Sequence, residues 1–207
     1  MQTTRLSFTP ADANLTGFAS NVTGATWTLT ATACTDALAH RISIKNDSIT
    51  SHSGKTALLT GTDVDGYVLT ETITLPGVSA TVESSNYFKT LTSVVPSATI
   101  GADTMDIGWV DEFISQTIPT KRSRSSRSQA ALALRVIVTG TINYTVQQTL
   151  DNVQTLTDRA FDWANHDSGS VVAAAISANA NYLVTPEASR LKVNSYSSGA
   201  TIQYIID

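Results

Sequence analysis

The sequence predicts an all-β protein made of two antiparallel β-sandwich or jelly-roll-like domains. Many short stretches alternate apolar and polar residues with the period of two of a half-buried strand. Glycine, proline, asparagine and aspartate separate these stretches and supply turns. Charged residues make up only 14% of the chain, against roughly 25% in typical domains, and threonine fills much of the difference. Because threonine is β-branched and polar, it suits the solvent-facing side of a strand.

The composition also narrows the class of protein. With 207 residues and 42% hydrophobic residues, the chain is long enough for one large or two small domains, each with its own core. A net charge of -4 and a pI of about 5.2 argue against nucleic acid as a partner. The only cysteine, Cys34, can form no intrachain disulfide and is expected to be a reduced, packed thiol. We expect neither a signal peptide nor a membrane span, because no apolar run is long enough for either.

The clearest element is a β-hairpin. One β-rich run covers Ala57–Thr62 and a second covers Tyr67–Leu75, with Asp63–Gly66 between them. In the second run the apolar residues share one parity and the threonines share the other. Aspartate carboxylates accept hydrogen bonds from turn amides, and glycine tolerates positive φ, so Asp63–Gly66 is predicted to be the turn.

The other elements of the first domain, residues 1–116, follow from the same alternation. The loop-like composition of residues 11–24 predicts no strand there, and Thr35-Asp36 opens a segment that fits one helical turn. Strands are expected at residues 5–8, 26–31, 41–45, 81–83, 87–95 and 105–110.

Residues 117–128 are predicted to be a linker or extended arm. The segment has no apolar periodicity and contains serines and basic residues without nearby acids. It is either a solvated interdomain linker or a basic arm that binds phosphate or an acidic neighbouring subunit. The basic side chains, which we treat as a candidate interface, are Lys121, Arg122, Arg124 and Arg127.

The second domain, residues 129–207, is expected to contain strands at 131–138 and 142–147 and a closing hairpin made of 190–194 and 201–206. Residues 171–180 are ambiguous, since their alanines allow a helix that asparagine and serine weaken. Trp163 lies in a polar loop, which makes it the aromatic residue most expected at an interface.

No catalytic, cofactor or metal motif is apparent, so we expect a protein that is not an enzyme and needs no cofactor. His40, His52 and His166 have no histidine or cysteine partner at metal-ligand spacing. His166-Asp167 is either an acid–base pair or a solvated loop, and we favour the loop. Asp63 and Asp65 are better explained by a turn than by a calcium site. The tryptophans, with Tyr67, Tyr144 and Tyr204, form either a sugar-stacking platform or, as we favour, core.

Several motifs resemble those of virion proteins of tailed bacteriophages. In the first domain they are Gly61–Gly66, Leu69–Ile73 and Tyr87–Thr90, in the style of a GTDxDG…TETIT…YFKT block. In the second domain the resemblance lies in Val138–Gly140, Tyr144–Asp151 and Trp163–His166. The resemblance implies a non-enzymatic structural protein and transfers no catalytic residue.

From the resemblance we expect a structural component of the virion, assembled in the host cytoplasm, that decorates or cements the capsid or joins neck and tail. Its expected partners are other virion proteins and further copies of itself, since free strand edges invite pairing between subunits. Membrane and nucleic acid are not expected partners. The alternative is a fibre or spike module that binds host-surface glycans through Trp163, and a weaker one is a hydrolase built on His166.

Overall fold

The computed structural model describes residues 3–120, 132–153 and 161–207. Within these ranges the only helical element is the 3-10 turn η1, Gly169–Val171, and antiparallel strands form the rest of the regular structure. The all-β prediction is therefore confirmed. In the described part of the chain no helix is long and apolar enough to cross a membrane.

The chain divides into two compact units. We call Ala11–Phe113 the central unit, and Met1–Pro10 together with Ile114–Asp207 the terminal unit. This division differs from the expected boundary at the N-terminus, because residues 4–8 form a strand that pairs with residues 202–206. Local alternation predicted the strand at residues 5–8 but carried no information about a partner so far along the sequence.

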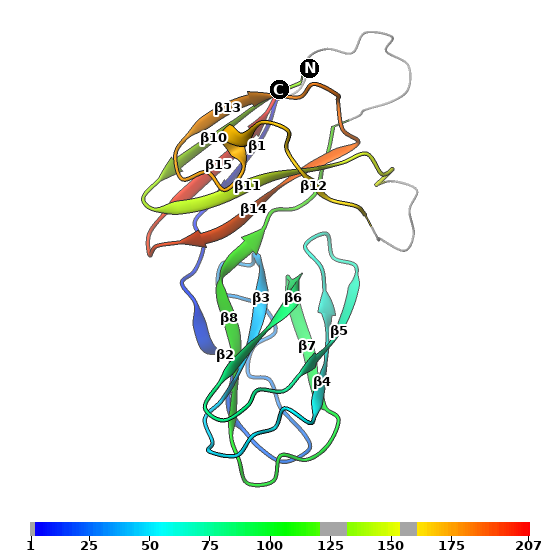
Figure 1. Cartoon of the computed structure of the whole chain (residues 1–207), viewed down its shortest axis with the longest axis vertical. Coiled ribbons are helices and arrows are strands. Elements are labelled where there is room, and N and C mark those ends of the chain that lie inside the picture. The colour runs from blue at the N-terminus through cyan, green and yellow to red at the C-terminus, as the bar shows by residue number, and fades with distance from the viewer. Residues whose placement is uncertain (1–2, 121–131, 154–160) are drawn as a thin grey trace. The chain divides into compact units, whose positions relative to one another are not determined.

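The central unit is a sandwich of two sheets (Figure 1). One sheet has the order β5-β4-β7, and in the other β2 pairs with β8, β8 with β3 and β3 with β6. The bounds are β2 Asn14–Val22, β3 Ala39–Asn46, β4 Thr56–Thr62, β5 Val68–Thr74, β6 Thr81–Phe88, β7 Thr90–Pro96 and β8 Met105–Ile114.

The predicted hairpin is present. Strands β4 and β5 pair without a register shift, from Thr56 opposite Thr74 to Thr62 opposite Val68. In the turn, the Asp63 carboxylate accepts hydrogen bonds from the amides of Asp65 and Tyr67, both at 2.9 Å. Gly66 has a φ of +89°, a backbone conformation that is costly for any residue with a side chain. Asp63 thus serves the turn, as the sequence indicated.

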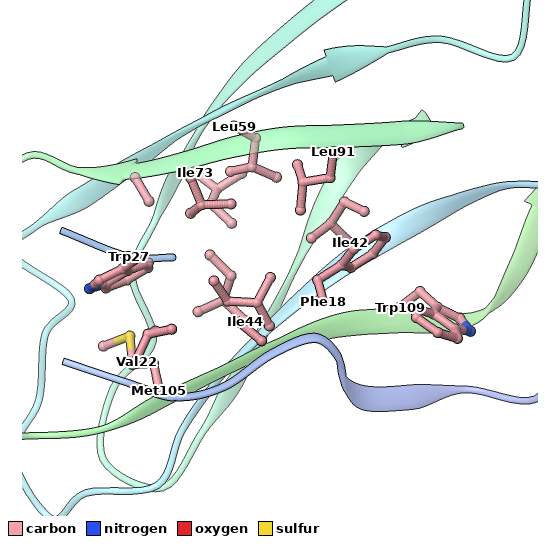
Figure 2. Packing of buried hydrophobic residues seen from close by; sticks show 14 of the residues in the cluster. Phe18, Val22, Trp27, Ile42, Ile44, Leu59, Ile73, Leu91, Met105 and Trp109 are labelled. Carbon is pink, nitrogen blue, oxygen red and sulfur yellow. The ribbon is translucent and has the colours of Figure 1, made fainter. Parts of the chain in front are cut away.

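The core of the central unit lies between its two sheets. Figure 2 shows side chains of the three-stranded sheet facing side chains of β2 and β3. Phe18 and Trp109 meet edge-on with ring centroids 5.3 Å apart. A Cβ on Gly17 would stand 1.9 Å from Trp109 Cζ3, so this close approach requires glycine. Residues of this core include Phe18, Val22, Trp27, Ile42, Ile44, Leu59, Ile73, Leu91, Met105 and Trp109.

Two predictions for the first half of the central unit are wrong. Residues 11–24 contain β2, an irregular strand that pairs with β8 at only three positions. Residues 26–31, predicted as a strand, form no ladder. Their alternation reflects burial, because Trp27 is buried and Leu29 and Ala31 are partly buried against the core. The amides of Thr30 and Ala31 both donate to the Phe18 carbonyl oxygen of β2 instead of forming a ladder with that strand.

The terminal unit also contains two sheets. One has the order β1-β15-β10-β13; in the other, β11 pairs with both β12 and β14, and β9 pairs with β14. The bounds are β1 Thr4–Phe8, β9 Ile118–Pro119, β10 Ala133–Thr139, β11 Ile142–Thr149, β12 Ala164–Asn165, β13 Ala178–Asn181, β14 Ala188–Tyr196 and β15 Thr201–Ile206. The ambiguous segment 171–180 is mostly irregular and ends in β13.

The predicted C-terminal hairpin is wrong. Strands β14 and β15 are adjacent in sequence, but β15 pairs with β1 and β10 while β14 pairs with β11 and β9. The turn at Ser197–Ala200 therefore carries the chain from one sheet to the other. The expected linker also begins as a strand, because Ile118 and Pro119 of β9 pair with Ser189 and Ala188.

A buried hydroxyl network connects the two sheets of the terminal unit. Ser189 on β14 donates to the Gln147 carbonyl oxygen at 3.0 Å and so accepts from Tyr204 on β15 and from Tyr182, the latter at 2.6 Å. Burial raises the pKa of Tyr204 well above its ordinary value, which keeps its hydroxyl protonated as a donor. This network satisfies polar groups that would otherwise be costly inside the core.

Candidate functional site

The outer side of the three-stranded sheet in the central unit is an uncharged surface. Along β4, Ala57 and Leu59 are fully buried. The alternate residues of this strand, Thr56, Leu58, Thr60 and Thr62, point the other way. Their partners on β5 are all exposed, and those on β7 include an exposed valine. We call this surface the threonine face; it consists of Thr56, Leu58, Thr60, Thr62, Val68, Thr70, Thr72, Thr74 and Val95.

Apolar side chains interrupt the threonines. Leu58 and Val95 lie directly opposite each other in the register of β4 and β7, and their side chains are 43% and 52% exposed. Val68, the first residue of β5, is 81% exposed. Cross-strand neighbours of this kind contact each other, so Leu58 and Val95 form one apolar area rather than two isolated ones.

The single charged residue of β4, β5 and β7 is absent from the threonine face. Glu71 has the inward parity of β5. Its carboxylate accepts hydrogen bonds from the backbone amides of Ser85 at 2.6 Å and Asn86 at 2.9 Å, both on β6. The acid therefore holds β5 against β6 and leaves the outer side neutral.

The chemistry of the threonine face suits contact between proteins better than catalysis. None of its residues titrates near neutral pH, so it offers no general acid or base. Its hydroxyls are partly satisfied within the sheet, as Thr62 Oγ1 lies 2.7 Å from Thr90 Oγ1. Burying such a surface against another protein takes no charged group out of water and leaves no buried charge without a partner.

Trp163, the predicted interface residue, is half-buried in the terminal unit. The Arg190 guanidinium lies 4.1 Å above its ring, and Phe161 meets it edge-on at 6.4 Å. Arg190 Nε also donates to Gln147 Oε1 at 2.8 Å. One face of the indole is therefore used in a cation–π contact. The role of Trp163 at an interface stays a prediction.

The basic arm lies outside the described residues. Lys121, Arg122, Arg124 and Arg127 were predicted as a candidate interface, and that prediction stays as it was made.

The aromatic residues do not assemble into a sugar platform. Trp27, Trp109, Tyr144 and Tyr204 are buried in the two cores, as favoured from the sequence. Tyr67 is 53% exposed at the hairpin turn. The rings considered for stacking therefore serve mainly as core.

His166 is a packed side chain, so the favoured prediction of a solvated loop is wrong for its ring. It is 4% exposed, its ring centroid lies 4.5 Å from that of Tyr182, and its Nδ1 accepts a hydrogen bond from the Ser168 amide at 2.9 Å. Burial lowers the pKa of His166, against the opposing charge of exposed Asp167. Because Nδ1 is an acceptor, the neutral ring carries its proton on Nε2, which is buried without a hydrogen-bond partner among the described residues.

Sequence reasoning missed one cluster. Cys34, Asp36 and His40 each direct a potential metal-ligating atom into a region where these atoms lie within 4.8 Å of one another. Cys34 itself is a buried free thiol, as expected. The only signal in the sequence is the Cys-x-Asp-x-x-x-His spacing across a turn, which matches no common metal motif.

Comparison with known proteins identifies no relative: no family model, no curated protein and no solved structure matches the chain.

Proposed function

We propose that the chain is a structural subunit of a tailed-phage particle, whose threonine face binds another protein subunit of that particle. Assembly takes place in the host cytoplasm, and the subunit decorates or cements the capsid or joins neck and tail. The observation that carries the proposal is the neutral, partly apolar outer side of the β5-β4-β7 sheet.

The composition of the threonine face supports a role in protein contact. The buried centres of protein interfaces are depleted in charged residues and tightly packed. Leu58 and Val95 provide an apolar centre, and the threonines around them offer short side chains whose χ1 is already restricted. Little conformational entropy is therefore lost when this face is covered.

The glycan-binding alternative draws less support from the geometry. A stacking platform presents an open aromatic face to the sugar, whereas Arg190 covers one face of Trp163. We therefore put the threonine face first and keep Trp163 as the residue to test if no virion role is found.

The test uses a phage that encodes the chain, with its gene deleted and supplied from a plasmid. The wild-type chain, a Leu58→Glu plus Val95→Glu double variant and an Ile49→Glu control are compared. Ile49 is 88% exposed in the same unit but does not belong to the threonine face, so its variant carries a new charge elsewhere. Mass spectrometry of purified particles measures how many copies each contains.

We expect wild type and Ile49→Glu to be incorporated equally, and the double variant at about one tenth of that level or less. Absence of the wild-type chain from purified particles would overturn the virion role. Normal incorporation of the double variant would leave that role standing and refute the assignment of the threonine face. Circular dichroism of the soluble variants excludes misfolding as the cause.

A further inference from the structure

Three side chains converge at the start of β3 in the central unit. The Ala37 amide donates to the Cys34 carbonyl oxygen at 3.0 Å, closing a turn. Ala37 has a φ of +58°, a left-handed conformation that reverses the chain before β3 begins at Ala39. Residues 34, 36 and 40 are thereby brought to one place.

Their ligating atoms lie close together. One atom from each of Cys34, Asp36 and His40 falls within 4.8 Å of the others, and His40 Nε2 is 2.9 Å from Asp36 Oδ2. A tetrahedral zinc ion with bonds of about 2.0–2.3 Å separates its ligand atoms by roughly 3.3–3.8 Å. The distance between His40 Nε2 and Asp36 Oδ2 would have to lengthen by less than about 1 Å to reach that geometry. The distances from these two atoms to the Cys34 sulfur would have to shorten by about 1 Å at most.

The outer partners of these residues are those typical of metal ligands. His40 Nδ1 lies 3.1 Å from the Val110 carbonyl oxygen, to which it donates, so Nε2 is the nitrogen turned toward Asp36. The Asp36 carboxylate accepts from the amides of Ala11 at 2.7 Å and Leu38 at 2.9 Å. Such contacts fix the orientation of histidine and carboxylate ligands.

We propose that Cys34, Asp36 and His40 bind a divalent cation of the zinc class, leaving one coordination position for water. A thiolate, an imidazole and a carboxylate suit Zn²⁺, whereas Ca²⁺ and Mg²⁺ require oxygen ligands. Binding displaces the thiol proton of Cys34 and any proton held between His40 and Asp36, and the displaced protons pass to solvent. The ion clips the 34–37 turn to β3, independently of any contact made by the threonine face.

The site is enclosed. Cys34 is 4% exposed and the His40 side chain is fully buried, while the Asp36 side chain is 7% exposed. The carboxylate is therefore the most exposed of the three ligands.

The experiment titrates the purified full chain, freed of metal by a chelator, with Co²⁺ as a spectroscopic substitute for Zn²⁺. Three variants accompany wild type: Cys34→Ser, His40→Gln and the control His52→Gln. His52 is a close match for His40, since it is 3% exposed and its Nε2 lies 3.0 Å from Asp103 Oδ2 in the same unit. The two histidine–aspartate pairs differ in that the Cys34 thiol lies beside His40 and Asp36.

We expect one Co²⁺ per chain, with a thiolate-to-cobalt charge-transfer band that Zn²⁺ abolishes by displacement. Cys34→Ser removes the band, and His52→Gln leaves both band and affinity unchanged. His40→Gln weakens binding by more than about 100-fold, which exceeds the roughly 10–100-fold cost of losing an outer partner. Absence of the band in folded wild-type protein, or its survival in Cys34→Ser, overturns the proposal.

A second measurement keeps the test decisive if His40→Gln fails to fold. An ion that binds only the folded chain raises its melting temperature by mass action. Zn²⁺ should therefore raise the melting temperature of wild type and His52→Gln but not of Cys34→Ser. An equal rise in all three, or none in wild type, contradicts the site.

Discussion

The central and terminal units connect neighbouring strands in different ways. In the central unit, β4 and β5 pair directly across a turn, whereas in the terminal unit β10 and β11, and likewise β14 and β15, belong to opposite sheets. All three turns contain a glycine with positive φ: Gly66 at +89°, Gly140 at +82° and Gly199 at +74°. Turn chemistry therefore shows where the chain reverses, but it does not decide whether the two strands pair.

The units also differ in how they accommodate polar groups in the core. The central unit uses a buried histidine–aspartate pair, His40 with Asp36. The terminal unit uses the neutral hydroxyls of Tyr182, Ser189 and Tyr204. Hydrogen bonds to the ionised Asp36 carboxylate are stronger than hydrogen bonds between neutral hydroxyls, so their loss should cost more. Substitutions in the two networks should therefore differ in how much stability they cost and in which unit they destabilise.

The largest effect is expected from Asp36→Ala. Removing the carboxylate leaves the Ala11 and Leu38 amides and the buried His40 ring without this partner, which should cost about 3–5 kcal/mol in all, at about 1.5–3 kcal/mol per hydrogen bond to a charged group. Hydrogen exchange read by mass spectrometry should show the loss of protection in Ala11–Phe113. Asp103→Ala is the matched control, because Asp103 pairs with His52 but its side chain is 29% exposed, so its loss should cost less. Equal costs for the two variants would contradict the importance of burial.

Gly61→Ala should follow, at about 1–3 kcal/mol. A Cβ at Gly61 would stand 1.9 Å from the Thr90 carbonyl oxygen, so β4 and β7 must separate. Gly54→Ala is the control, since nothing lies within 4 Å of a Cβ there and its φ is not positive. Urea unfolding measures both. If Gly61→Ala is as stable as Gly54→Ala, the β4–β7 pairing is not as close as described.

Ser189→Ala tests the terminal unit, with an expected loss of about 1–3 kcal/mol. The substitution removes the acceptor of two buried tyrosine hydroxyls and the donor to Gln147. Hydrogen exchange should increase in β14 and β15 while the central unit stays protected. Ser170→Ala, an exposed serine of the same unit, should change nothing. A uniform increase over both units would show that they do not open separately.

The smallest expected effect is a difference between the two units in how their stability depends on pH. Burial lowers the pKa of His166 below 6.5, so the unfolded chain binds more protons and the terminal unit loses stability as the pH falls below about 6.5. Burial alone would raise the pKa of Asp36, but its hydrogen bonds and the His40 charge outweigh that effect and lower it below 3.8. The Asp36 contribution is therefore complete above about pH 4 and is lost only in stronger acid.

Between about pH 7 and pH 5 we thus expect hydrogen exchange, corrected for its intrinsic pH dependence, to speed up in the terminal unit. His166→Gln should remove most of this change. If the change persists undiminished in His166→Gln, His166 is not its source.

Sequence patterns located strands better than they located partners. Alternation found most strands, including both arms of the central hairpin, because burial on one face is a local property. It failed at residues 26–31, where Trp27, Leu29 and Ala31 do turn toward the core but the backbone forms no ladder. It also missed β2, because the buried residues of that strand, Phe18, Ala19 and Val22, do not alternate along its irregular ladder.

The candidate sites show the same limit. Threonine on solvent-facing strand positions was expected, yet the threonine face depends on β7 pairing with β4, and nothing local specifies that order. The cluster of Cys34, Asp36 and His40 requires a left-handed Ala37, and alanine gives no sign of that conformation.

The pairing of β1 with β15 gives this chain a particular order of folding. Thr4 faces Ile206, so the central unit is nested inside a loop that the terminal unit must close. During synthesis the central unit has all its strands long before β15 leaves the ribosome, and it can fold while β1 waits unpaired. Once folded, it replaces a long flexible loop by a compact body, which lowers the entropic cost of the final closure. A destabilised central unit should therefore also slow the folding of the terminal unit.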